Sequence, residues 1–256
     1  MHPVLLNIGN FNLYTYGLFA ALGFMTAVWV SQKNAATHDI SPQAVTDIFF
    51  VILVSALFGA RLLYVLINFN NYKDNWLDIF KIWNGGLVFF GGFLGAVIAS
   101  FIYMKMQNFN TWKTADLLSP GVALGHALGR LGCFFAGCCY GKICDLPFAI
   151  KFTNPESLAP LDVYLHPTQI YSVLSNFILF FILMGIQKKK KFNGMVFLTY
   201  IMLYSLFRFI IEFFRGDFRG NFIFDSISMS QGIGLMVFFI ALIILIKQLR
   251  PFYGSK

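Results

Sequence analysis

The chain has few charged residues for its length. Only 12% of its 256 residues are Asp, Glu, Lys or Arg, whereas 58% are hydrophobic. A soluble domain carries roughly twice that charged fraction, so the composition excludes an ordinary soluble globular protein. It predicts an all-α polytopic membrane protein.

Several other features are missing. Residues 2–11 lack a basic head and a small-residue cleavage site, so we expect no cleavable signal peptide. The four cysteines all lie between positions 133 and 144, which argues against a distributed disulfide framework. They also lack the C-x2-C spacing of structural zinc sites. Packing in an apolar environment is the default role for Cys133 and Cys139, and the sequence predicts no metal and no cofactor. No internal repeat is visible, although transporters often contain one.

Seven apolar segments are long enough to span a bilayer. Their predicted limits are residues 13–31, 47–67, 85–106, 115–135, 168–187, 195–214 and 226–247. We expect seven transmembrane helices that form a single domain over residues 1–256. The longest connection, residues 137–167, is predicted to be a small extracytoplasmic cap inserted in that domain, with short strands such as 148–152.

The positive charges predict the orientation of the chain. With the N-terminus outside and the C-terminus in the cytoplasm, ten lysines and arginines, Lys256 among them, lie inside and six, Arg219 among them, lie outside. The four lysines of the run Lys188–Lys191 account for the difference between the two sides. Because this run fits a cytoplasmic loop, the net charge of +8 does not predict a nucleic-acid partner.

Charged residues inside the apolar segments are the strongest functional signal. Arg208 and Glu212 lie in segment 195–214, and Arg130 lies in segment 115–135. A charge at the bilayer centre costs roughly 2.5–3.5 kcal/mol on insertion scales, so such charges usually face a polar cavity. Tyr204, Arg208, Glu212 and Arg215 share one helix face. A structural ion pair is the simpler interpretation. However, one glutamate cannot neutralise three arginines, and the surplus favours a phosphate ligand.

Other polar residues extend this candidate site. His126 lies one helical turn before Arg130, and Arg61 lies near the middle of its own segment. His166 and Gln169 flank the start of segment 168–187, where Thr168 or Gln169 could cap the helix. Close packing would explain most glycines. Alternatively, a lipid headgroup could approach the backbone at the Gly-Gly pairs 85–86 and 91–92.

Taken in order, these motifs resemble the bacterial prolipoprotein diacylglyceryl transferase family. The matching residues are Y-G-L at 16–18, G-A-R-L at 59–62, G-G-L-V-F at 85–89, the A-D to G-R-L-G series at 115–132, Y-G at 140–141, D-L-P at 145–147, H-P-T-Q-I-Y at 166–171 and the Y-x3-R-x3-E-F-F-R series at 204–215. Each motif is weak alone, but their shared order across most of the chain is specific.

The resemblance implies an enzyme of the bacterial cytoplasmic (inner) membrane. Such an enzyme transfers the diacylglyceryl group of phosphatidylglycerol to the lipobox cysteine in the signal peptide of a prolipoprotein, which yields a thioether and glycerol phosphate. The resemblance implies Arg130, Arg208 and Glu212 as catalytic residues, and we add His166 and His126 as candidate bases. The expected substrate-binding residues are Tyr16, Arg61, Gly85, Gly86, Gly91, Gly92, Cys138, Gly141, Gln169, Tyr204 and Arg215.

Three departures from the family pattern leave alternatives open. Phe90 replaces a usual His or Tyr, Cys133 replaces an Asn, and Cys138 replaces a Glu. The lost base could be replaced by His126 or His166, because imidazole is a suitable base near neutral pH. A second possibility is a different acceptor, with Cys138 as nucleophile or metal ligand. A third is a non-enzymatic lipid or anion transporter.

Overall fold

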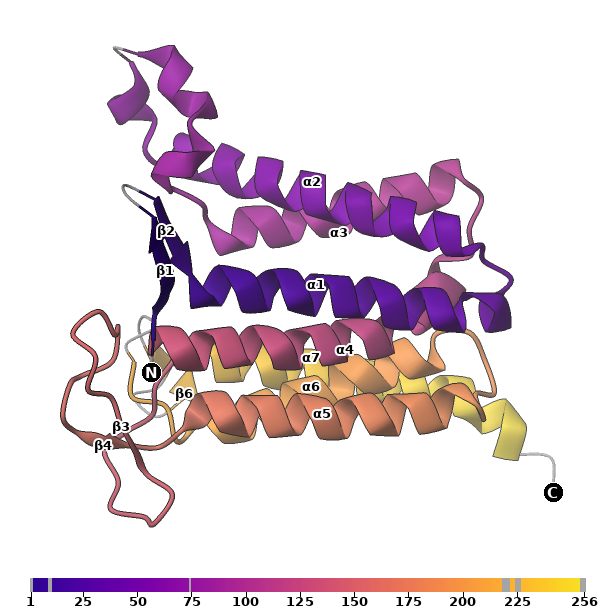
Figure 1. Cartoon of the computed structure of the whole chain (residues 1–256). Helices are drawn as coiled ribbons and strands as arrows, with labels where there is room; N and C mark the ends of the chain where they lie inside the picture. The colour runs from indigo at the N-terminus through magenta and orange to yellow at the C-terminus, as the bar shows by residue number, and fades with distance from the viewer. Residues whose placement is uncertain (1, 9–10, 74, 218–221, 224–226, 254–256) are drawn as a thin grey trace. The chain divides into compact units, whose positions relative to one another are not determined.

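The computed structural model describes residues 2–8, 11–73, 75–217, 222–223 and 227–253. Within these residues the chain forms seven α-helices (Figure 1). They are α1 (Thr15–Asn34), α2 (Pro42–Ile67), α3 (Phe89–Met106), α4 (Thr111–Ala136), α5 (Thr168–Gln187), α6 (Met195–Glu212) and α7 (Met229–Tyr253). Each predicted segment overlaps one of these helices, although α1, α2, α4 and α7 extend beyond the predicted limits, and the all-α class is confirmed. Ser226, where the last segment was predicted to begin, lies outside the described residues, as do Arg219 and Lys256.

The remaining elements are short. Three antiparallel pairs are formed by β1 (Val4–Ile8) with β2 (Phe11–Tyr14), β3 (Ile150–Lys151) with β4 (Tyr164–Leu165), and β5 (Phe222–Ile223) with β6 (Ile227–Ser228). The 3-10 helices are η1 (Ala35–His38), η2 (Phe69–Tyr72), η3 (Trp76–Phe80) and η4 (Ile82–Asn84).

Five helices of the described chain, α2, α3, α5, α6 and α7, are long and apolar enough to cross a membrane. They also expose large apolar side chains: Phe50 and Phe58 of α2 are 65% and 69% exposed. Water would oppose such exposure, whereas lipid tails accommodate it. The chain is therefore an integral membrane protein. Helix α4 is not among the five, because glycines, His126 and Arg130 dilute its apolar residues.

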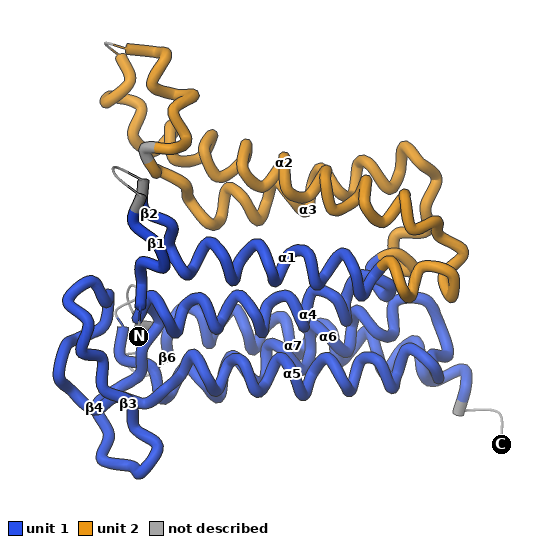
Figure 2. The backbone as a smooth tube through the Cα atoms, in the orientation of Figure 1, with its two compact units in different colours: residues 1–31, 115–256 blue, residues 32–114 orange. Residues whose placement is uncertain are grey.

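The chain divides into two compact units (Figure 2). Unit 2, residues 32–114, is built around the hairpin of α2 and α3. These helices approach closely at glycines, because a Cβ atom added at Gly95 would lie 2.6 Å from the Ser55 carbonyl oxygen. Small residues that let backbones approach are typical of membrane helix pairs.

Unit 1 comprises residues 1–31 and 115–256. In it, α6 packs against both α5 and α7. A buried apolar cluster joins α4, α5 and α6 and contains Ala123, Leu179, Leu183 and Val196. Helices α1 and α4 meet backbone to backbone, since a Cβ atom at Gly23 would lie 2.5 Å from the carbonyl oxygen of Gly125.

A buried aspartate of α4 fixes the beginning of α6. The side chain of Asp116 is fully buried and accepts hydrogen bonds from the backbone N–H groups of Gly194 (2.8 Å) and Phe197 (2.9 Å). Lys190 Nζ lies 3.4 Å from the same carboxylate. The first N–H groups of a helix have no partner within the helix, so Asp116 acts as a cap supplied by another helix.

The connection between α4 and α5 contains the β3–β4 pair. The predicted strand at 148–152 is shorter in the structure and covers Ile150–Lys151. A turn precedes it, in which the Ala149 N–H donates to the Leu146 carbonyl, and Phe152 forms a separate bridge with Leu161. Phe152, Ala159 and Leu165 bury their side chains together as a small core. The connection is therefore folded rather than an open loop.

Candidate functional site

A polar pocket lies among α4, α5 and α6 of unit 1. The space between its lining side chains, including the part that opens to the outside, is about 250 Å³. Its lining residues are His126, Arg130, Ser172, Ser175, Asn176, Tyr204, Phe207, Arg208 and Ile211. Two pairs of these residues, His126 with Arg130 and Tyr204 with Arg208, are each one helical turn apart. The structure thus brings four of the predicted site residues, two of them arginines, around one cavity.

Arg130 bridges the pocket and the loop that follows α4. Its Nε donates to His126 Nε2 at 3.2 Å, and its Nη1 donates to Cys139 Sγ at 3.7 Å. No carboxylate of the described residues forms an ion pair with Arg130. Because Arg130 occupies the Nε2 lone pair, His126 must carry its proton on Nδ1 when neutral. Neither ring nitrogen is then free to accept a substrate proton in this geometry.

Arg208 is paired with a buried glutamate. Arg208 Nη1 and Glu212 Oε2 are 2.5 Å apart, and their side chains are 16% and 7% exposed. Ser228 Oγ donates to the other carboxylate oxygen at 3.0 Å. Two arginines, Arg130 and Arg208, line the described pocket, and its lining contains no carboxylate. Because Glu212 pairs with only one of them, the pocket is electropositive.

Arg215 has a carboxylate that the sequence analysis did not assign to it. Its Nε and Nη2 bind both carboxylate oxygens of Asp217, at 2.8 and 2.7 Å, and Glu212 Oε2 lies 3.8 Å from its Nε. The expectation that a single glutamate faces three arginines is therefore wrong, because Asp217 neutralises Arg215. Arg130 and Arg208 remain as the two cations that line the pocket.

Two buried side chains at the start of α5 hold the loop after α4. Gln169 Nε2 donates to the Cys138 carbonyl at 2.8 Å, and Thr168 Oγ1 donates to the Cys139 carbonyl at 2.7 Å. Both side chains are 1% exposed. Neither caps α5 through its side chain, contrary to the sequence expectation, because both bond across to the cysteine loop.

His166 lies beside this loop and is not among the residues that line the pocket. Its Nδ1 is 3.0 Å from the Tyr171 hydroxyl, and its ring packs edge-on against Phe214. Its carbonyl accepts from the Gly141 N–H at 3.1 Å. A Cβ atom at Gly141 would lie 2.5 Å from His166 Cβ, so close packing requires glycine there.

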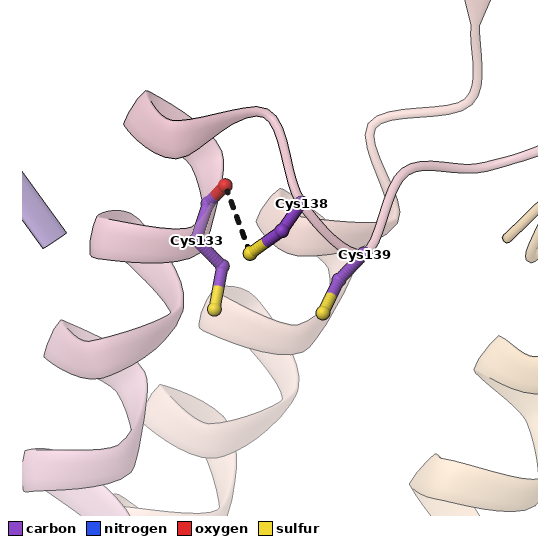
Figure 3. A group of neighbouring side chains, drawn as sticks. All are labelled: Cys133, Cys138 and Cys139. Carbon is purple, nitrogen blue, oxygen red and sulfur yellow. Dashed lines mark hydrogen bonds between the residues drawn. The ribbon is translucent and has the colours of Figure 1, made fainter. Parts of the chain in front are cut away.

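Three cysteine thiols converge where α4 ends (Figure 3). The Sγ atoms of Cys133, Cys138 and Cys139 all lie within 4.8 Å of one another. Cys138 Sγ also lies 3.7 Å from the Cys133 carbonyl, to which it donates. Hydrogen bonding to the thiols of Cys133 and Cys138 holds the pKa of the Cys139 thiol below its usual range, and the Arg215 guanidinium acts in the same direction. The spacing in the sequence did not predict this cluster.

The predicted site residues of unit 2 belong to a loop and a helix contact. The buried Arg61 guanidinium donates to four backbone carbonyls, those of Asp78, Ile79, Gly85 and Gly86, at 2.7 to 3.2 Å. Gly91 and Gly92 face α2, where close packing accounts for them. In unit 1, Tyr16 lies in the first turn of α1 and is 48% exposed. Substrate binding by these residues stays a prediction.

Known proteins are similar in sequence to this chain over nearly its full length. The model of the family described as prolipoprotein diacylglyceryl transferase matches residues 3–247. The phosphatidylglycerol–prolipoprotein diacylglyceryl transferase of Clostridium tetani (strain Massachusetts / E88) is 37% identical over 244 residues, which are 95% of this chain and 96% of that protein. The enzyme of the same name from Clostridium botulinum (strain Loch Maree / Type A3) is 34% identical and covers 94% of this chain and 96% of its own. That of Geobacter sulfurreducens (strain ATCC 51573 / DSM 12127 / PCA) is 33% identical and covers 94% and 92%. A family match over residues 3–247 and this identity over nearly the full length show that the chain belongs to the prolipoprotein diacylglyceryl transferase family.

Proposed function

We propose that this protein transfers the diacylglyceryl group of phosphatidylglycerol to the lipobox cysteine of prolipoproteins. The sulfur of that cysteine attacks the glyceryl carbon that carries the phosphate, the carbon–oxygen bond breaks, and glycerol phosphate leaves. The observation that carries this proposal is the placement of Arg130 and Arg208 around one pocket. The names of the relatives support the two substrates.

The pocket chemistry suits a phosphate that becomes a leaving group. A guanidinium presents a planar fork that binds two phosphate oxygens at once. Positioned cations stabilise the negative charge that develops on the leaving oxygen. In this proposal the phosphate of the headgroup lies against the two arginines that line the pocket. The acyl chains would extend between the helices into the bilayer.

Glu212 positions Arg208 in this proposal. The 2.5 Å ion pair holds the Arg208 guanidinium at the wall of the pocket. Tyr204 lies one turn earlier on the same face and contributes a hydroxyl. Gln169 and Gly141 act indirectly, because both hold the loop from Cys138 to Gly141 against the start of α5.

Transfer by the purified full-length protein tests the proposal. Phosphatidylglycerol and a peptide with a lipobox cysteine are supplied in detergent, and both the lipidated peptide and free glycerol phosphate are measured by mass spectrometry. Arg130→Gln and Arg208→Gln should each lower kcat by about 10²–10³-fold, the usual effect of losing one contact to a developing oxyanion. Arg→Lys at either position should restore part of the rate.

A matched control is Arg250→Gln, which removes an exposed arginine of α7 far along the chain from the pocket residues. It should retain the wild-type rate. Full transfer by Arg130→Gln and Arg208→Gln would refute the proposal, as would anion transport in proteoliposomes without lipid turnover.

His126→Asn and His166→Asn test the histidine bases in the same assay, and wild-type rates in both would exclude them.

We further propose that all seven helices cross the cytoplasmic membrane as one domain, with the N-terminus outside and residues 137–167 as a cap on the outer face. The apolar helices and the Lys188–Lys191 run between α5 and α6 support this topology. A reporter active only in the cytoplasm, fused after Lys256, should be active. The same reporter inserted after Glu156 in the connection should be silent, and activity there would refute this orientation.

A further inference from the structure

The cysteine cluster has the dimensions of a metal site. Three thiolates bound to zinc at about 2.3 Å would stand roughly 3.8 Å apart in tetrahedral geometry. The sulfurs of Cys133, Cys138 and Cys139 already lie within 4.8 Å of one another (Figure 3). Small side-chain rotations would therefore bring all three onto one ion, without a change in the helices.

The backbone holds these cysteines in place. Cys133 is on the last turns of α4, and Cys138 and Cys139 follow the helix after Gly137, which has a φ of +75°. Cys139 itself has a φ of +62°, a conformation that a non-glycine residue adopts only when its surroundings enforce it. The bonds from Gln169 and Thr168 to the two loop carbonyls supply that enforcement. Adjacent cysteines are thus able to point to one side.

The charges around the cluster suit three thiolates. One zinc ion with three thiolates has a net charge of −1, and Arg130 Nη1 already donates to Cys139 Sγ. Among the described residues no fourth Cys, His, Asp or Glu joins the group, and Cys144 is outside it. Structural zinc sites have four protein ligands, whereas catalytic sites have three and keep one position open.

We propose that Cys133, Cys138 and Cys139 bind a zinc ion and that the open position of this ion receives the sulfur of the acceptor cysteine. The second part rests on the transferase function proposed above. A thiol that coordinates zinc loses its proton, which passes to water. The bound sulfur then forms the bond to the glyceryl carbon with its own electron pair. The carbon–oxygen bond breaks, and glycerol phosphate leaves with that bond's electrons. No oxidation or reduction occurs.

Arg130 would connect this ion to the pocket. One edge of its guanidinium faces His126 in the pocket, and another nitrogen contacts the cysteine cluster. The acceptor sulfur and the leaving phosphate would then lie on either side of one side chain. This arrangement would produce a thiolate without a histidine base, and it uses the two cysteines that depart from the family pattern.

Metal analysis of the full-length protein in detergent tests the site. Wild type should contain zinc at a ratio to protein near one, and Cys133→Ser, Cys138→Ser and Cys139→Ser should each lose most of it. Cys144→Ser is the matched control, because it removes a buried cysteine outside the cluster, and it should keep the metal. Each variant is first checked for a monodisperse peak and for wild-type thermal stability. Absence of zinc, copper in its place, a disulfide within the cluster, or equal loss in the control would overturn the site.

Cobalt substitution tests the open position. The cobalt-loaded protein should show thiolate-to-cobalt absorption, and its visible spectrum should change when a lipobox peptide is added. A peptide with Ser in place of the cysteine should leave the spectrum unchanged. An identical spectrum with both peptides would overturn the acceptor role, as would a diacylglyceryl adduct on Cys138 itself.

The two proposals fail in different ways. Normal diacylglyceryl transfer by a zinc-free protein would remove the zinc proposal and leave the transferase intact. Zinc binding with a cysteine-dependent spectral change but no lipid transfer would remove the transferase function and leave the thiol-binding metal site. Transfer by the cluster variants should fall at least tenfold, while Cys144→Ser should transfer normally.

Discussion

Replacing Asp116 should destabilise the bundle by an amount that its contacts predict. Its carboxylate accepts from two backbone N–H groups at the start of α6 and is fully buried. A buried donor left without a partner costs about 1–3 kcal/mol. Asp116→Ala leaves both N–H donors without an acceptor, so we expect the free energy of unfolding to fall by roughly 2–6 kcal/mol. In Asp116→Asn the amide oxygen satisfies one donor and the NH₂ group opposes the other, so we expect about half that loss.

The nearby lysine provides the control. Lys190 lies 3.4 Å from the carboxylate, but its side chain is 19% exposed. Lys190→Met removes only this long contact and leaves both N–H bonds to the carboxylate in place, so it should cost less stability than either change at Asp116. The order of losses should therefore be Asp116→Ala, then Asp116→Asn, then Lys190→Met. This order follows from the hydrogen bonds alone.

Thermal unfolding in detergent, followed by intrinsic tryptophan fluorescence, measures this order. Transfer activity below the unfolding temperature should fall with stability, because α6 carries Arg208 and Glu212. If Asp116→Asn unfolds at the same temperature as Lys190→Met, the capping role is wrong. The same conclusion follows if Asp116→Ala is as stable as wild type.

Three further outcomes are expected. Gly23→Ala should lower stability by about 1–3 kcal/mol in thermal unfolding, because the new methyl group meets a carbonyl of α4, whereas Gly185→Ala, with open space around it, should not. Asp217→Asn should loosen the forked pair with Arg215 and lower the unfolding temperature, and an unchanged temperature would contradict this role. The pKa of Asp39 is lowered in the folded protein by its lysine partner, so the ion pair stabilises the fold above the usual carboxyl range and is lost as the pH falls through the folded pKa. Asp39→Asn should therefore remove a small part of the acid sensitivity seen in unfolding scans at successive pH values.

Much of the framework could be predicted because membrane helices have a strong hydropathy signal. The pocket could also be predicted in part. His126 with Arg130 and Tyr204 with Arg208 follow helical periodicity, so each pair shares a face whatever the tertiary packing. The sequence could not show that the two faces meet, and only the packing of α4 beside α6 does so.

Other contacts depend on backbone geometry that spacing does not encode. Asp217 reaches Arg215 from beyond the end of α6, where no periodicity applies. The three thiols converge because Cys139 adopts a left-handed conformation, which its residue type does not predict. Gly137, two residues earlier, was the one available sign of a sharp turn.

The hydrogen bonds of Arg61 affect how the activity of variants at this position should be interpreted. The Arg61 guanidinium donates to four main-chain oxygens, and no acid in the described part of the chain forms an ion pair with it. Shortening the side chain at this position would leave those oxygens without their hydrogen-bond donor and would unfold the loop that contains them. Loss of activity in Arg61→Ala would thus follow from loss of the loop structure, and it would not show whether this residue contacts lipid.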